Sequence, residues 1–253
     1  MDWAGTAVDY GCFAPVAAFI EAFAEKGLII DVAQTRKPMG LPKIQHIREL
    51  LSMPEVNEQF ATRYQRVWTE EDVVELNRLF EKHLFASLEN YTDPIPGVIP
   101  TLEKLRAEGL KIGSTTGYTR EMMNVVLPAA QAKGYRVDYC ATPNLLPAGR
   151  PAPYMIFENL IKLGVDSLDA VVKVGDTIAD IKEGVNAKVC SVGVVLGSNE
   201  MALTEAETKA MPAAELEARI ADVKERMFAA GASYVILSME ELPALIERMN
   251  ADR

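Results

Sequence analysis

Short apolar runs alternate with stretches of helical spacing from residue 98 onward, and this alternation limits the fold more than any other feature. The runs rich in β-branched residues are "LKIGSTT" (110–116), "VDYCAT" (137–142), "AVVKVGD" (170–176), "CSVGVVL" (190–196) and "SYVIL" (233–237). Apolar residues at helical spacing separate them over 120–134, over 152–163 and from about 178. This order predicts βαβ units, and therefore a parallel sheet covered on both faces. The expected fold class is α/β, with a Rossmann-like core.

The first 92 residues differ from the rest of the chain. They contain helical patterns over 13–27, 43–52 and 70–91 but no convincing strand, and "DPIPG" (93–97) then breaks the pattern. We therefore expect an α/β core domain made of residues 1–10 and 93–253. Residues 11–92 are expected to be an all-helical insertion in that domain. The Ala/Glu-rich segment 198–230 is expected to be a surface excursion with one helix.

Charge and composition exclude several classes of function. The chain has 26 Lys and Arg against 36 Asp and Glu, a net charge of −10, and no basic stripe, so a nucleic-acid partner is not expected. No apolar run approaches the ~20 residues of a membrane span, and no signal peptide precedes Asp2. The three widely spaced cysteines are typical of reduced thiols. We expect a cytoplasmic protein that acts on a small, anionic substrate without a membrane partner.

Polar residues follow several of the predicted strands. Asp2 opens the chain, Thr116 and Asp176 close two strands, Thr177 comes next, and Arg150 precedes a predicted helix. Parallel strands end at one edge of a sheet, where ligands bind. Two carboxylates there can hold Mg²⁺, hydroxyl and guanidinium groups suit a phosphoryl group, and an aspartate can act as a nucleophile. For any single aspartate at a strand end, helix capping is the more common explanation than catalysis, but the whole set in this order is specific.

The order of these residues resembles that of the haloacid dehalogenase-like superfamily, over nearly the whole chain. Most phosphatases of the superfamily place a second aspartate two residues after the nucleophile, as the acid that protonates the leaving alkoxide. Ala4 occupies that position here. A leaving group that departs as an enamine carbon does not need the same protonation.

Motifs spanning residues 2–184 closely resemble one family of the superfamily, the phosphonoacetaldehyde hydrolases (phosphonatases). These motifs are "DWAGT", "YGCFAP", "KPMGL.K..H", "GSTTGYTREMM", "PAGRP" and "KVGDT.AD.KEG". The resemblance implies that the helical insertion is a cap whose lysine, here Lys43, forms a Schiff base with the substrate aldehyde. It also implies hydrolysis of the P–C bond of phosphonoacetaldehyde to acetaldehyde and phosphate, in 2-aminoethylphosphonate degradation, by a homodimer.

The resemblance implies a role for several residues of the core. Asp2 would attack phosphorus and form an aspartyl-phosphate, and Mg²⁺ would be held by Asp2, the backbone carbonyl of Ala4 and Asp176. The remaining residues would surround the substrate and the metal: Thr116 and Arg150 at the phosphonate oxygens, Thr177 and Asp180 ordering the metal shell, and Tyr118 and Cys12 lining the site without an assigned chemical role.

Lys43 must be an unprotonated amine to attack the aldehyde, so its pKa must fall well below the free value of ~10.4. Met39 and Leu41 would supply an apolar surround. His46, at i+3 from Lys43, would lie on the same helix face and either transfer protons or make a structural hydrogen bond. Composition alone would describe Lys43 as a solvated lysine. His83, in the stretch 70–91, is expected to be structural.

Only Met1 precedes the "DWAGT" turn, whereas proteins of this family have an apolar strand there, in the middle of the sheet. We expect the true start to lie upstream; the alternative is that the chain lacks a central strand.

Two other functions remain open. One is a generic Mg²⁺-dependent phosphatase or phosphomutase of the superfamily, which would want an acid at position 4 and have no use for Lys43. The other is an inactive, truncated relative, which would be expected to lose Asp2, Asp176 or Lys43.

Overall fold

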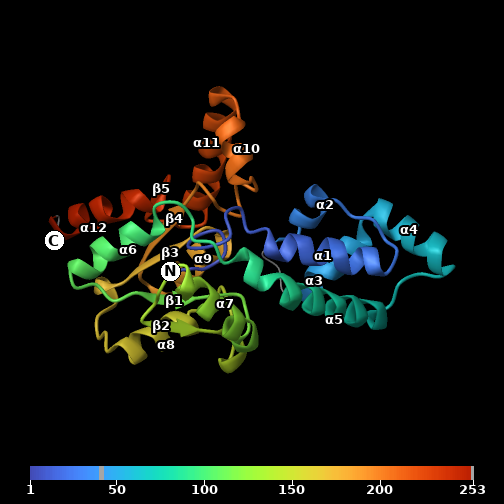
Figure 1. Cartoon of the computed structure of the whole chain (residues 1–253), viewed down its shortest axis with the longest axis horizontal. Helices are drawn as coiled ribbons and strands as arrows, with labels where there is room; N and C mark the ends of the chain where they lie inside the picture. Colours follow the sequence, from blue (N-terminus) through green and yellow to red (C-terminus); the bar gives the residue numbers. More distant parts are fainter. Residues whose placement is uncertain (40–42, 252–253) are drawn as a thin grey trace. The chain divides into compact units, whose positions relative to one another are not determined.

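The computed structural model describes residues 1–39 and 43–251, which form two compact units. The core unit consists of Met1–Cys12 and Thr92–Arg253, and the helical unit of Phe13–Tyr91 (Figure 1). The sequence analysis placed the two divisions after residues 10 and 92, whereas the structure places them after Cys12 and Tyr91.

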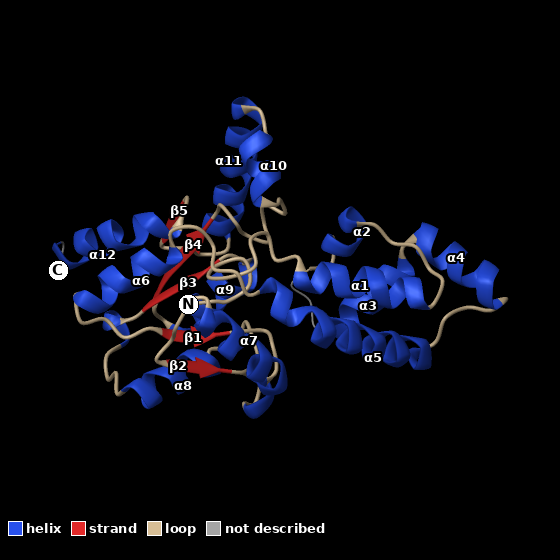
Figure 2. Ribbon diagram, in the orientation of Figure 1, coloured by secondary structure: helices blue, strands red, loops and turns tan. Residues whose placement is uncertain are grey.

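All the strands of the described residues lie in the core unit (Figure 2). They are β1 (Gly113–Thr115), β2 (Tyr139–Ala141), β3 (Val172–Gly175), β4 (Cys190–Val194) and β5 (Tyr234–Ile236). β1 pairs with β2, and β3, β4 and β5 pair in that order, always in parallel. Each strand lies inside one of the five predicted runs, and the predicted α/β fold with a parallel sheet is confirmed.

Met1 and Asp2 lie between β1 and β3 and join the two sheets. The amide of Asp2 donates to the carbonyl of Val174 in β3 at 2.9 Å, and the amide of Thr115 in β1 donates to the carbonyl of Met1 at 2.9 Å. The Met1 amino group donates to the carbonyl of Gly113 at 2.8 Å. The backbone ladder therefore runs from β2 through β1, residues 1–2 and β3 to β5.

A groove of about 450 Å³ continues beside Met1 along β1 and β3. Its walls are mostly apolar, with Leu105, Ile156, Leu160, Val172 and Ile246 among the residues that line it. The groove lies next to residues 1–2, which join the two sheets.

Helices flank the strands of the core unit. They are α6 (Val98–Ala107), α7 (Arg120–Ala132), α8 (Tyr154–Leu163), α9 (Ile178–Ala187), α10 (Glu205–Ala210), α11 (Ala213–Ala229) and α12 (Leu242–Ala251). α8 packs against β1 and β2, and α9 packs against β3 and β4. The expectation of one helix in 198–230 was wrong. Thr204 and Glu207 form a capping box that starts α10, and Pro212 precedes the start of α11, which divides the segment.

The helical unit contains α1 (Ala14–Glu25), α2 (Val32–Arg36), α3 (Lys43–Ser52), α4 (Pro54–Tyr64) and α5 (Glu70–Ser87), followed by a 3₁₀ turn (Leu88–Tyr91). Aromatic side chains fill its interior, with Phe19, Phe23, Phe60 and Phe80 fully buried. The sequence analysis did not predict α2 or α4. Both have local start signals, a capping box of Asp31 with Gln34 for α2 and Pro54 in the first turn of α4.

Within the described part of the chain, every helix is too short or too polar to cross a membrane. Its three cysteines form no disulfide.

Candidate active site

Asp176 follows β3 directly, at the carboxyl end of the strand where a ligand of a parallel sheet is expected. Thr177 then caps α9. Its hydroxyl accepts from the amide of Asp180 at 3.1 Å and donates to Oδ2 of Asp180 at 2.6 Å. This capping box fixes Asp180 one turn beyond Asp176.

The turn after Asp2 holds Asp176 in place. The Thr6 hydroxyl donates to Oδ1 of Asp176 at 2.8 Å, and the amide of Asn199 donates to Oδ2 at 2.8 Å. Gly5 has φ +86°, and a Cβ added there would overlap the carboxylate of Asp176. Glycine is therefore required at position 5 for two reasons, the left-handed backbone and the close approach of Asp176.

Asp2, Asp176 and Asp180 form a buried acidic cluster, with one carboxylate oxygen of each within 4.8 Å of the others. Burial raises the pKa of Asp2, although the charge of Arg150 opposes the shift. Burial and then the charges of Asp2 and Asp180 raise the pKa of Asp176 well above its usual value. Asp180 differs, because Arg150 and Lys173 outweigh the effect of its burial and lower its pKa. Asp2 and Asp176 are thus the carboxylates whose burial is not fully compensated by cationic neighbours.

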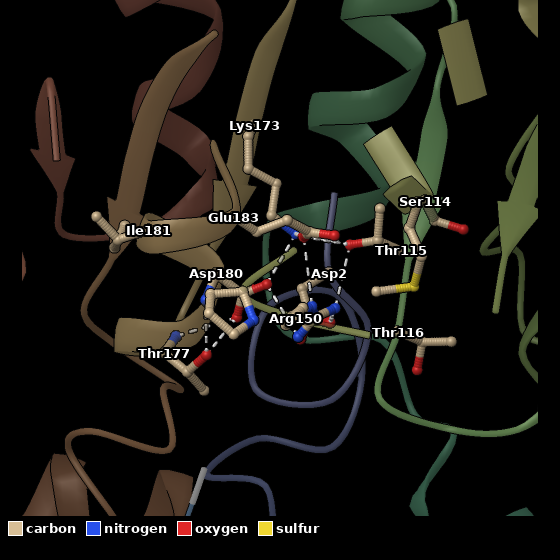
Figure 3. Close-up of polar contacts among 12 residues, drawn as sticks. Asp2, Ser114, Thr115, Thr116, Arg150, Lys173, Thr177, Asp180, Ile181 and Glu183 are labelled. Carbon is tan, nitrogen blue, oxygen red and sulfur yellow. Dashed lines mark hydrogen bonds and ion pairs between the residues drawn. The ribbon is translucent and has the colours of Figure 1, made fainter. Parts of the chain in front are cut away.

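Arg150 lies at the centre of the cluster (Figure 3). Its Nη2 atom contacts Oδ1 of Asp2 and donates to the Thr115 hydroxyl at 3.1 Å, and Nη1 lies 2.9 Å from Oδ1 of Asp180. Its Nε atom lies 3.4 Å from Oε2 of Glu183. These acids raise the pKa of Arg150 against the effect of its burial. The guanidinium is therefore held at the end of β1, next to the proposed nucleophile.

The same cluster contains Thr115 at the end of β1 and two residues that were not selected from the sequence, Lys173 and Glu183. Lys173 in β3 lies 2.7 Å from Asp180 and 2.9 Å from Glu183. The side chains of Lys173 and Glu183 are almost completely buried. The signal in the sequence was a lysine inside the apolar run "AVVKVGD", because a buried lysine needs an acid partner.

The charges of this cluster fit a divalent cation. Its four carboxylates face the two cationic side chains described above, which leaves an excess of two negative charges in a buried site. Burial, followed by repulsion among these carboxylates, raises the pKa values of Asp2 and Asp176. A hard divalent ion with oxygen ligands would neutralise the excess charge, so the residues present fit Mg²⁺.

The other predicted core residues lie in the same unit. Thr116 is buried, and its hydroxyl accepts from the amide of Tyr118 at 3.1 Å. Tyr118 is itself mostly buried. Ala4 pairs with Val8 in the opening turn, and Cys12, with φ 55°, ends the first segment of the core unit. The hydroxyl that bonds Arg150 belongs to Thr115, and the substrate-binding role of Thr116 stays a prediction.

In the helical unit, Lys43 and His46 lie one turn apart on α3 beside a stack of rings. Phe19 stacks on His46 with centroids 4.0 Å apart and on Phe80 with centroids 4.1 Å apart. The Nζ atom of Lys43 lies 5.5 Å from the centroid of Phe19 and 5.6 Å from that of Phe80. Burial, followed by the charge of Lys43, lowers the pKa of His46 to about 3, although the backbone of Thr35 opposes the shift. His46 is therefore neutral near pH 7.

Met39 is half-buried, and its amide donates to the carbonyl of Arg36 at 3.0 Å. Leu41 lies outside the described residues. The ring nitrogens of His83 lie 3.0 Å from Glu21 and 2.7 Å from Glu25.

A comparison with protein families finds that the model of the haloacid dehalogenase-like hydrolases matches residues 1–188. The α/β core is that of this class of hydrolase. A protein named phosphonoacetaldehyde hydrolase from Bacteroides fragilis is 85% identical over 251 residues, which cover 99% of this chain and 95% of that protein. The chain belongs to the haloacid dehalogenase-like superfamily and, within it, to the phosphonoacetaldehyde hydrolase family.

Two further comparisons agree. A bifunctional phosphonoacetaldehyde hydrolase/aminoethylphosphonate transaminase from Clostridioides difficile is 51% identical over 97% of this chain and 38% of that protein. The crystal structure of a phosphonoacetaldehyde hydrolase-like protein from Oleispira antarctica matches with a TM-score of 0.91 and 34% identity, covering 99% of this chain and 91% of that one.

Proposed function

We propose that the protein hydrolyses the P–C bond of phosphonoacetaldehyde to acetaldehyde and phosphate, with Lys43 acting on the aldehyde and Asp2 on phosphorus. The names of its relatives support this substrate. The relative that joins the hydrolase to an aminoethylphosphonate transaminase supports a place in 2-aminoethylphosphonate degradation.

The P–C bond needs an electron acceptor, because a free carbanion is a poor leaving group. The Lys43 amine would condense with the aldehyde and release water, giving a protonated imine. When the P–C bond breaks, its electron pair passes into this imine and yields an enamine on Lys43. Protonation and hydrolysis of the enamine then release acetaldehyde and free Lys43.

His46 is suited to proton transfer in these steps. It is neutral near pH 7 and one helical turn from Lys43, so it can accept a proton from the lysine or from the adduct it forms. The neighbouring rings of Phe19 and Phe80 limit the water around Lys43.

At phosphorus, Asp2 would attack and form an aspartyl-phosphate, which a water molecule then hydrolyses. Arg150 would bind phosphoryl oxygens as the charge on them develops, together with Thr116. Asp2, Asp176 and the Ala4 carbonyl would hold Mg²⁺, with Thr177 and Asp180 ordering them, and the ion would offset repulsion between the two anions. Tyr118, Cys12 and Met39 would line the substrate site.

The observation that carries the proposal is the pairing of Lys43 with a neutral, buried His46, together with alanine at position 4. A phosphatase that protonates an alkoxide does not need this pair. It needs an acid at position 4, where this chain has alanine. An inactive relative would not be expected to keep Asp2, Asp176 and Lys43 together.

The test measures phosphate and acetaldehyde release from phosphonoacetaldehyde in Mg²⁺, with and without borohydride. Borohydride should inactivate the enzyme during turnover and leave N-ethyl-lysine at Lys43, located by peptide mass spectrometry. Lys43→Arg keeps the charge but cannot form the imine, so it should lose P–C cleavage. Substantial cleavage by Lys43→Arg, or faster release of phosphate from simple phosphate esters, would contradict the proposal.

We also propose that the protein is a homodimer, as the family resemblance implies. Light scattering coupled to size-exclusion chromatography measures the mass directly, and a monomer at micromolar concentration would contradict this.

A further inference from the structure

Lys173 is a buried lysine to which the proposed reaction gives no task. It lies in β3 between Val172 and Val174, and only 3% of its surface is exposed. A lysine in a buried strand loses its hydration, so specific partners must offset the free-energy cost of burying its charge.

Lys173 joins three elements at one point (Figure 3). Its Nζ atom donates to the Thr115 hydroxyl of β1 at 2.7 Å and lies 2.7 Å from Oδ1 of Asp180 on α9. It also lies 2.9 Å from Oε2 of Glu183, on the same helix. The Thr115 hydroxyl in turn donates to Glu183 at 3.1 Å. Lys173 and Glu183 thus tie the end of β1 to the first turns of α9.

Arg150 shares these partners and also contacts the proposed nucleophile. It contacts Asp2 and lies 2.9 Å from Asp180 and 3.4 Å from Glu183. A guanidinium that binds phosphoryl oxygens has to give up part of these contacts, because its donors are few and directional. Asp180 and Glu183 would then depend more on Lys173, the cation that keeps its contacts with both of them.

We propose that Lys173, paired with Glu183, is a positioning residue that keeps Thr115 and Asp180 fixed while Arg150 exchanges its contact with Asp2 for the phosphoryl oxygens of the substrate. This inference rests on the proposed function for the identity of the phosphoryl group. Lys173 itself touches neither the substrate nor the reacting atoms.

The test compares the full-length Lys173→Met and Lys173→Arg variants with wild type in Mg²⁺, by calorimetric titration with inorganic phosphate and by steady-state kinetics. Lys173→Met should weaken phosphate binding and lower kcat by at least about tenfold each. Lys173→Arg, which keeps the charge, should recover part of both. Lys182→Met is the matched control, because Lys182 is an exposed lysine of α9 next to Glu183 and should behave as wild type.

A second measurement separates this inference from the proposed function. Borohydride trapping of acetaldehyde on Lys43 uses no phosphoryl group, so it should proceed at the wild-type rate in Lys173→Met. Absence of trapping in wild type would refute the role of Lys43 and leave the phosphate titration as the test of Lys173. Wild-type phosphate affinity and kcat in Lys173→Met, with only a lower Tm, would overturn the inference.

Lys173→Met alone leaves buried acids unpaired and risks misfolding. The double variant Lys173→Met/Glu183→Gln removes both charges of the pair and should fold with the same loss of phosphate affinity. Wild-type phosphate affinity in the folded double variant would equally overturn the inference.

Discussion

The hydroxyl of Thr6 donates a hydrogen bond to Oδ1 of Asp176 at 2.8 Å, although 170 residues separate the two in the sequence. Together with the amide of Asn199, this bond occupies both carboxylate oxygens of Asp176 from the side of the opening turn. The turn therefore does more than carry Asp2, because it also sets where the second strand-end carboxylate lies.

Gly5→Ala should disable this arrangement. The added Cβ would overlap the carboxylate of Asp176, so we expect that carboxylate to move and Mg²⁺-dependent turnover to fall by about 10² or more. Gly109→Ala is the matched control, since Gly109 has the same φ of +86° but no atom within 4 Å of an added Cβ. The control should lose only the stability that alanine costs at a positive φ, which is more than about 0.4–1 kcal/mol of the free energy of unfolding. Equal losses of turnover in both variants would show that backbone strain alone is responsible.

Asp176 and Asp180 should respond in opposite ways to removal of their charge. The pKa of Asp176 is raised, so its ionised form opposes folding, and metal-free stability falls as pH rises through that pKa. Asp176→Asn should therefore raise the Tm in excess chelator at pH 7 and abolish the rise in Tm that Mg²⁺ gives wild type. The pKa of Asp180 is lowered, so its stabilising effect is present at pH 7 and is lost in acid.

Asp180→Asn should accordingly lower the Tm in chelator, because it removes an ionised partner of both Arg150 and Lys173. Thermal melts of the three proteins with and without Mg²⁺ check both effects. The charge argument fails if the two variants shift the metal-free Tm in the same direction. Chelation should also stop wild-type turnover, and added Mg²⁺ should restore it.

His46 should make the protein sensitive to mild acid. Its pKa is lowered to about 3 in the folded state, so the unfolded chain takes up a proton first as pH falls below about 6.5. The stability from neutral His46 is complete above that pH and declines toward pH 3, with a loss of about 2 kcal/mol at pH 5. His46→Phe keeps a ring beside Phe19 but cannot take up a proton. Its Tm should therefore decrease less between pH 7 and pH 5 than that of wild type. Thermal melts of wild type and His46→Phe at pH 7 and pH 5 measure this difference.

Phe80→Leu should slow imine formation at Lys43. The substitution removes the ring that stacks on Phe19 and faces the lysine, which admits water beside Lys43. Since hydration favours the protonated ammonium over the amine that attacks the aldehyde, we expect a decrease of about fivefold in the rate of borohydride trapping with acetaldehyde. Phe85→Leu, on the exposed side of the same helix, should leave that rate unchanged. A trapping rate in Phe80→Leu equal to that of Phe85→Leu would show that the ring stack does not affect imine formation at Lys43.

An apolar extension before Met1 should stabilise the core unit. The groove between β1 and β3 is lined mostly by apolar residues, so about eight strand-forming residues added there should continue the backbone ladder and bury apolar surface. We expect a higher Tm and a faster turnover than with a Gly/Ser extension of equal length. Similar melts for the two extended proteins would show that the groove does not accept a strand.

The sequence predicted the strands and the principal acids because each is encoded locally. A run such as "CSVGVVL" forms a strand from its own side chains, and Asp176 follows a strand wherever that strand lies. The contact partners are not local. Thr115 and Thr116 are adjacent, and only the tertiary structure shows that the Thr115 hydroxyl bonds Arg150 while that of Thr116 bonds the Tyr118 amide. Lys173 was visible in the sequence as a charge inside an apolar run, but its partners on α9 were not.

The insertion of the helical unit after Cys12 has a consequence for how the protein is made. The segment that carries Asp2 is synthesised before the helical unit, yet the strand against which it hydrogen-bonds is at Val172–Gly175, beyond the whole helical unit. That segment therefore cannot pair with β3 until Val172–Gly175 has been synthesised, and closing so long a loop makes its docking a late step. The helical unit is contiguous, so its own interior can form on the nascent chain well before the acidic cluster exists. Affinity for a divalent ion should therefore develop only after the core unit has folded, so metal binding can be used to measure the completion of that unit.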